Sequence, residues 1–191
     1  MKILLEREHV LDESICAVFE KATGSLGEYS DGHYSSGEKE FIGIIKLLYT
    51  KDCIPAEMIG NAFVTAAMKG ESELVALLRG DSRISARMVG KAFAAAAARK
   101  KSDLMMSLYD TNISADAILA AFSNAASRER IRNVKELVKL LSDKDRVPQE
   151  FQHKAFMVAA QLRHDTVHPF LCESVDGNWP LTTLQQALAL A

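Results

Sequence analysis

Apolar residues fall at helical spacing in a repeat that recurs along the chain. Its clearest copy occupies residues 54–78, where Gly70 separates two apolar stretches. The first stretch lines one face of a helix with about 3.6 residues per turn. That face consists of Ile59, Ala62, Phe63, Ala66 and Ala67. The second stretch, residues 74–78, predicts another helix, so each repeat is expected to be a pair of helices.

An Ala-Phe pair followed by an Ala-Ala pair marks the same register in four copies. Each Ala-Phe pair begins eight residues after the aliphatic residue that opens its copy. The four opening residues are Ile54, Ile84, Ile113 and Val147. Weaker copies open near residues 10 and 179. The spacing of most copies is close to the roughly 30 to 34 residues that are typical of helical repeat arrays.

Small and large apolar side chains are combined in a way that suits close helix packing. Alanine pairs allow neighbouring first helices to approach closely, and one phenylalanine per repeat fills the space beside them. We therefore expect a single all-α domain over residues 1–191, built as a right-handed α-solenoid of stacked antiparallel helix pairs. Partial repeats at both ends indicate either a segment of a longer array or irregular end caps. The many glycine and serine residues within 24–39 predict a flexible surface loop.

The end of the clearest copy resembles a known repeat. Residues 66–78 read Ala-Ala-Met-Lys-Gly-Glu-Ser-Glu-Leu-Val-Ala-Leu-Leu and resemble the core of the ankyrin repeat, a likeness that extends over most of the chain. The Thr-Pro-Leu-His tetrapeptide of ankyrin repeats is missing from every copy. The resemblance therefore implies an ankyrin-like α-solenoid without β-hairpin fingers. It also implies protein–protein binding through a concave surface, and degenerate arrays of this kind resemble those in secreted effectors of pathogens.

Composition narrows the classes of protein that fit. The chain is 48% hydrophobic and 25% charged, as in folded soluble proteins, and its formal net charge of −2 provides no general basic field for nucleic acid. It lacks an apolar run of the ~20 residues needed to span a membrane, and its three cysteines include no C-x-x-C pair. We expect an intracellular protein, cytoplasmic or nuclear. Delivery into a host cell is the alternative that the resemblance to effectors leaves open.

The sequence contains no motif for catalysis, phosphate binding or metal binding. Neither a Gly-x-Ser-x-Gly elbow nor a phosphate-binding glycine loop is present, so we expect no enzyme activity, no cofactor and no small-molecule ligand. His164, His168 and Cys172 have the spacing of three ligands on one helix face. Pro169 interrupts such a helix and structural zinc takes four ligands, so no metal site is predicted.

Exposed positions of the first helices are the best candidates for partner binding. They form two rows, seven and eleven residues after each opening residue. The first row contains Asn61, Lys91, Ala120, Lys154 and Gln186, and the second contains Thr65, Ala95, Asn124 and Val158. The rows vary between copies while the core positions do not, as a binding face would, although ordinary solvated surface varies in the same way.

Eight residues are therefore predicted to bind a partner. Five of them come from the two rows: Asn61, Thr65, Lys91, Asn124 and Lys154. The other three, Tyr29, His33 and Tyr34, lie in the loop, where aromatic side chains could anchor a partner. The loop could equally be an unstructured insertion.

These patterns favour a non-enzymatic scaffold that binds another protein, either on its own or as a segment of a larger protein or pathogen effector. One alternative is binding of nucleic acid or of an acidic partner through basic residues that close successive first helices. These residues are Lys69, Arg99, Arg128 and Arg163. The helix dipole provides a simpler reason for cations at these positions. The second alternative is a non-catalytic domain that positions a substrate for a larger enzyme.

Overall fold

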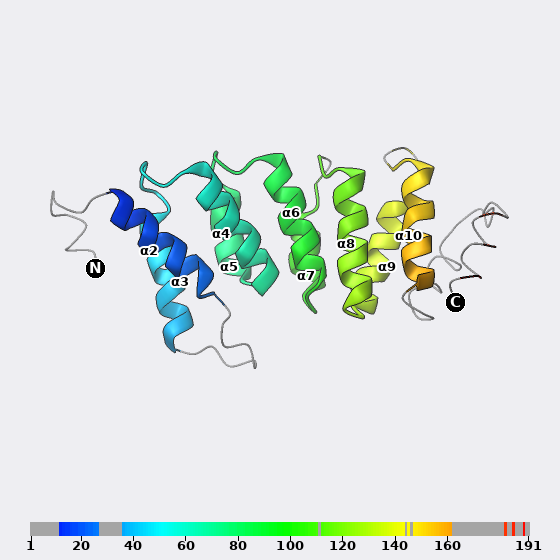
Figure 1. The fold of residues 1–191 in the computed structure, drawn as a ribbon, viewed down its shortest axis with the longest axis horizontal. Coiled ribbons are helices and arrows are strands. Elements are labelled where there is room, and N and C mark those ends of the chain that lie inside the picture. Colours follow the sequence, from blue (N-terminus) through cyan, green and yellow to red (C-terminus); the bar gives the residue numbers. More distant parts are fainter. Residues whose placement is uncertain are drawn as a thin grey trace. The chain divides into compact units, whose positions relative to one another are not determined.

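The computed structural model describes residues 12–26, 36–110, 112–143, 145 and 147–161, and the single positions 182, 185 and 189. Within these residues the protein is all-α, with nine helices and no strand (Figure 1). The helices are α2 (Asp12–Gly24), α3 (Ser36–Leu48), α4 (Ala56–Lys69), α5 (Ser72–Arg79), α6 (Ala86–Ala97), α7 (Ser102–Leu108), α8 (Ala115–Ser127), α9 (Ile131–Leu141) and α10 (Gln149–Gln161). They contact mainly helices that are close in the sequence, as in a helical array. The predicted all-α class is confirmed.

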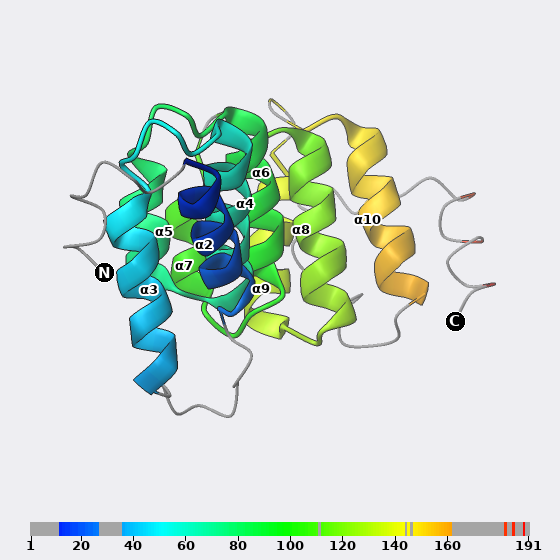
Figure 2. The ribbon, with the colours of Figure 1, turned by 60° about the vertical axis from the view of Figure 1, so that its left-hand side comes forward.

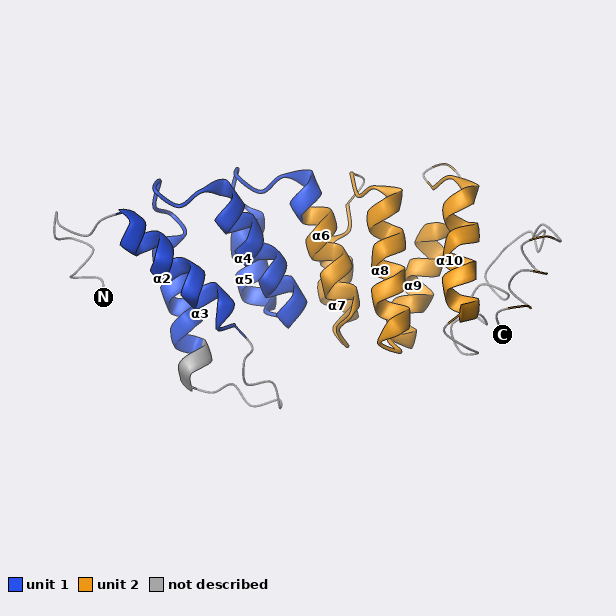
Figure 3. Ribbon diagram, in the orientation of Figure 1, with its two compact units in different colours: residues 1–88 blue, residues 89–191 orange. Residues whose placement is uncertain are grey.

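The chain divides into two compact units, residues 1–88 and residues 89–191 (Figure 3). They are termed the N-terminal unit and the C-terminal unit. Their boundary lies inside α6, whereas boundaries between separate domains usually fall in exposed linkers. The single domain expected over residues 1–191 remains a prediction.

In the N-terminal unit, α2 packs against α3 and α4, and α4 packs against α5 (Figure 2). The turn between α4 and α5 depends on Gly70, which has a left-handed φ of 83°. The N–H groups of Gly70 and Glu71 donate to the carbonyl oxygens of Ala67 and Ala66, at 3.1 and 2.9 Å. A glycine adopts this conformation without the steric penalty of a Cβ. The predicted break between the two helices is therefore confirmed.

In the C-terminal unit, α8 packs against α9 and α10, and α7 contacts α9. The turn between α8 and α9 has the same construction as the turn at Gly70. Glu129 has a φ of 55°, and the N–H groups of Glu129 and Arg130 donate to Ala126 and Ala125, at 3.0 and 2.8 Å. Because Glu129 carries a Cβ, this conformation is strained by roughly 1 kcal/mol.

The residues that recur between the copies form a large part of the core. All the Ala-Phe and Ala-Ala pairs of the four copies are buried, and none of these side chains is more than 5% exposed. Close approach of the first helices also needs small residues outside the pairs. At Gly90 an added Cβ would lie 3.2 Å from the Cβ of Ala117 on α8. The apolar pattern of the sequence therefore marks buried positions, which leaves the positions between them to meet solvent.

Candidate functional site

The five row residues predicted to bind a partner all lie on first helices. In the N-terminal unit, Asn61 and Thr65 lie on α4, where Asn61 is exposed and Thr65 is half-buried. In the C-terminal unit, Lys91 on α6, Asn124 on α8 and Lys154 on α10 are all exposed. The structure therefore makes these side chains accessible, with Thr65 only partly so. Their role in binding stays a prediction.

Two of these side chains already have contacts within the C-terminal unit. The amide of Asn124 donates to the carbonyl oxygen of Ala94 at 2.8 Å, so this residue links α8 to α6. The ammonium of Lys154 lies 3.8 Å from Glu150 and 4.8 Å from the ring centroid of Phe151. Exposed ion pairs and cation–π contacts of this kind contribute little stability, so Lys154 can turn toward a partner at small cost.

Several predicted positions lie outside the described residues. These are the loop residues Tyr29, His33 and Tyr34, the spaced ligands His164, His168 and Cys172, and also Arg163 and Gln186. Among the residues that the structure does describe, no group of three or more His, Cys, Asp and Glu side chains could hold a metal ion. No helix in that same part of the chain is long and apolar enough to cross a membrane.

The basic residues expected at the ends of first helices lie there in the described repeats. Lys69 is the last residue of α4, Arg128 is the C-cap of α8, and Arg99 lies two residues beyond the end of α6. Cations are favoured at helix C-termini, where the carbonyl groups make the local potential negative. Their position is therefore explained by the helices themselves, without reference to a partner.

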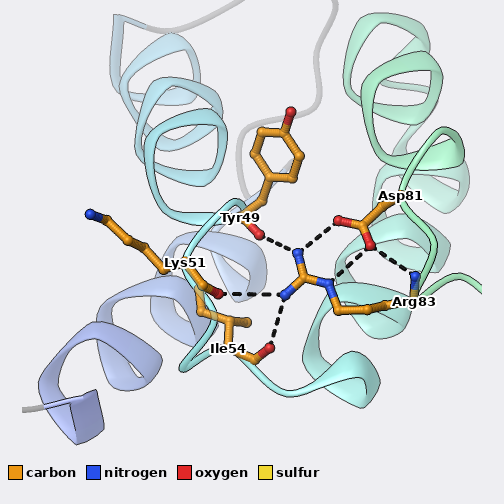
Figure 4. Close-up of polar contacts among 5 residues, drawn as sticks. All are labelled: Tyr49, Lys51, Ile54, Asp81 and Arg83. Carbon is orange, nitrogen blue, oxygen red and sulfur yellow. Dashed lines mark hydrogen bonds and ion pairs between the residues drawn. The ribbon is translucent and has the colours of Figure 1, made fainter.

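The structure adds a clamp at Arg83 that the sequence did not indicate (Figure 4). Its guanidinium pairs with Asp81 through two hydrogen bonds, Nε to Oδ1 at 2.9 Å and Nη2 to Oδ2 at 2.7 Å. The remaining N–H groups donate to backbone carbonyl oxygens beyond the end of α3. These belong to Tyr49 at 2.5 Å, Ile54 at 3.1 Å and Lys51 at 3.4 Å. Arg83 thus fastens the segment between α5 and α6 to the segment between α3 and α4.

The clamp is a charged pair with a structural role. Hydrogen bonding from Arg83 lowers the pKa of the Asp81 carboxyl, and the carboxylate in turn raises the pKa of Arg83. Both residues also line an open polar depression of about 570 Å³. Because all five N–H donors of the guanidinium have acceptors, Arg83 has no donor left for an anion in this depression.

A buried polar cluster in the C-terminal unit surrounds Asn133, which is 1% exposed. Its amide nitrogen donates to the carbonyl oxygens of Ala97 and Arg99, both at 2.7 Å. Its amide oxygen accepts a hydrogen bond from the Ser102 hydroxyl at 2.6 Å. Asn133 therefore satisfies carbonyl groups at the end of α6 and ties the start of α9 to the turn between α6 and α7. The signal in the sequence was a polar residue at an apolar position of its helix.

Two half-buried cysteines lie together in the N-terminal unit. The thiol of Cys16 donates to the carbonyl oxygen of Cys53, with a sulfur–oxygen distance of 3.3 Å. Burial raises the pKa of the Cys53 thiol above its ordinary value, and the negative charge of Asp12 raises it further. Both effects disfavour the thiolate, so Cys53 is a weak nucleophile at neutral pH.

Alkylation of Cys53 by iodoacetamide should therefore need a higher pH in the folded protein than in the protein unfolded by urea. The measurement is the rate of modification of the Cys53 peptide by mass spectrometry between pH 7 and 10. The midpoint of the pH profile reports the pKa of the thiol. Limited access to the thiol would slow alkylation at every pH and would leave the midpoint unchanged. Asp12→Asn should lower the midpoint pH of the folded protein part of the way toward that of the unfolded protein. Equal midpoints in folded and unfolded protein would contradict this account.

Comparison of the chain with protein-family models, with curated proteins and with solved structures finds no match. The likeness to ankyrin repeats therefore rests on the sequence pattern of the copies. The structure itself supports a coarser statement, that helices within each unit pack mainly on neighbours in the sequence.

Proposed function

We propose that this chain is an ankyrin-like helical-repeat scaffold, an α-solenoid of antiparallel helix pairs without β-hairpin fingers, that binds another protein through its first helices. The observation that carries the proposal is the division between constant and variable positions. The recurring Ala-Phe and Ala-Ala pairs are buried, whereas Asn61, Lys91, Asn124 and Lys154 are exposed and belong to rows whose residue types vary among the copies. Repeat proteins commonly hold a constant core and vary the residues of one binding face.

The C-terminal unit offers the clearest part of this face. Its first helices α6, α8 and α10 carry Lys91, Asn124 and Lys154. Asn124 donates to α6, so it holds the spacing of two first helices while its outer surface remains exposed. The two lysines have few competing contacts and are the residues that we expect to contribute directly to binding a partner.

The test is affinity capture of a partner from a cell lysate, comparing the natural protein with Lys91→Ala/Lys154→Ala. The matched control removes two exposed lysines from a second helix of the same unit, Lys135→Ala/Lys139→Ala. We expect the first pair to reduce capture of a specific protein about ten-fold and the control to leave it unchanged. Circular dichroism should show that both variants keep the helical content of the natural protein.

Two other outcomes point to different functions. Equal capture by both variants would contradict the assignment of the face. Recovery of nucleic acid in a strongly salt-dependent manner would favour the basic residues at the helix ends, Lys69, Arg99 and Arg128, over the lysines of the face. Capture of a single enzyme whose substrate binds this chain would favour a substrate-positioning domain.

A further inference from the structure

Two turns of the C-terminal unit lie side by side, one between α6 and α7 and the other between α8 and α9. The guanidinium Nε of Arg130 donates to the carbonyl oxygen of Ala98 at 3.0 Å. Asn133, at the start of α9, donates to Ala97 and Arg99. These bonds join residues that are 32 to 36 positions apart in the sequence. The two turns are therefore fixed next to each other.

This juxtaposition concentrates positive charge, because each turn is rich in basic residues. We define the basic patch as residues 99–103 and 128–132. It contains six basic side chains: Arg99, Lys100, Lys101, Arg128, Arg130 and Arg132. Only two acidic side chains, Asp103 and Glu129, belong to it. The patch is thus strongly positive in a chain whose formal net charge is −2.

The acidic residues of the patch do not neutralise it. Arg132 pairs with Asp103 at 3.5 Å, but the two side chains are 74% and 94% exposed. Such a pair is weak and readily exchanged, because water and salt screen it. Lys100 and Arg128 are exposed as well. At least three cationic side chains can therefore reach a ligand from the two adjacent turns.

We propose that the basic patch binds an acidic segment of a partner protein. Neighbouring packed helices lie about 8–10 Å apart, a distance that an extended peptide covers in about three residues. Arginine pairs with carboxylates through two parallel hydrogen bonds, which suits Arg128 and Arg132. The patch shares no residue with the face that carries Lys91 and Lys154, so this assignment does not rest on the proposed use of those lysines.

Carboxylates fit the patch better than nucleic acid does. Specific binding of duplex DNA commonly involves about 6–10 phosphate contacts over an extended track. The patch is limited to two turns, and the remainder of the chain is net negative, which repels a long polyanion. A short run of aspartate and glutamate residues needs only the two turns.

Fluorescence anisotropy with a labelled peptide of eight glutamate residues tests the assignment. The probe is compared with an eight-glutamine peptide and with a labelled single-stranded oligonucleotide of the same length. The variant Lys100→Gln/Arg128→Gln/Arg132→Gln removes three exposed charges from the patch. The control Lys39→Gln/Arg87→Gln/Lys139→Gln removes three exposed charges that belong neither to the patch nor to the predicted partner-binding face. We expect the patch variant to bind the glutamate peptide about ten-fold more weakly and the control to lose less than two-fold.

Binding of the glutamate peptide should also weaken as salt is raised from 50 to 300 mM. Three results would overturn the proposal. One is equal binding of the glutamine and glutamate peptides. The second is an equal loss in the patch variant and the control. The third is tighter binding of the oligonucleotide with the same dependence on the patch, which would assign the patch to nucleic acid instead. Loss of lysate capture in Lys91→Ala/Lys154→Ala would leave the result for the patch unaffected.

Discussion

Asn133→Ala should lower the free energy of unfolding by about 2–4 kcal/mol, because it leaves several buried polar groups without a hydrogen-bond partner. The carbonyl oxygens of Ala97 and Arg99 each lose a donor, and the Ser102 hydroxyl loses its acceptor. Solvent cannot replace these partners easily, since Ser102 and Asn133 are both buried. Urea unfolding followed by circular dichroism measures the loss.

The isosteric change Asn133→Asp separates hydrogen bonding from packing. A carboxylate cannot donate to the two carbonyl oxygens and would place a buried charge against them, so we expect a loss at least as large as for alanine at neutral pH. Burial favours the neutral carboxyl of the introduced aspartate, which can donate one hydrogen bond. The difference in the free energy of unfolding between Asn133→Asp and the natural protein should therefore become smaller as the pH falls.

Asn124→Asp is the matched control for this substitution, because it replaces an exposed asparagine that makes a single bond to Ala94. It should lower the free energy of unfolding by no more than about 1 kcal/mol. Similar losses for the two aspartate substitutions would show that the buried cluster contributes no more to stability than the single hydrogen bond of Asn124.

Much of the fold could be predicted from the sequence, because the apolar periodicity within each repeat indicates which of its residues are buried. The periodicity of Ala62, Phe63, Ala66 and Ala67 predicts one buried helix face, and that face is buried in the structure. The break at Gly70 could also be predicted, since glycine has access to the left-handed conformation that ends α4. The same conformation at Glu129 could not, because a glutamate gives no sign of it.

The polar contacts between repeats were much harder to predict. Arg83 donates to backbone carbonyls that lie 29 to 34 positions away in the sequence. Because every residue has a backbone carbonyl, the residue types do not show which carbonyls accept these bonds. Of the basic patch, the repeat pattern indicates only Arg99 and Arg128, which follow first helices of successive copies. The two basic turns form one patch because hydrogen bonds from Arg130 and Asn133 bring them together. Side-chain exposure follows from the helix register, but the neighbours of a turn follow from packing between repeats.

Removal of the clamp by Arg83→Ala should destabilise the N-terminal unit by about 2–4 kcal/mol. The substitution leaves Asp81, whose side chain is 9% exposed, without its cationic partner. It also removes the donors to the carbonyl groups of Tyr49, Lys51 and Ile54. Arg83→Lys keeps the charge but cannot reproduce the two-pronged contact and the carbonyl contacts together, so it should recover only part of the loss.

The pH dependence identifies the contribution of the ion pair. The pKa of Asp81 is lowered in the folded protein, so the pair adds stability that is fully present above the unfolded value of about 3.9 and is lost as the pH falls through the folded value. The difference in the free energy of unfolding between the natural protein and Arg83→Ala should therefore be constant from pH 6 to 8 and should become smaller below about pH 4. Arg87→Ala is the control, since Arg87 is exposed in the first turn of α6, where a cation is unfavourable. It should be neutral or slightly stabilising, and an equal loss in both variants would contradict the clamp.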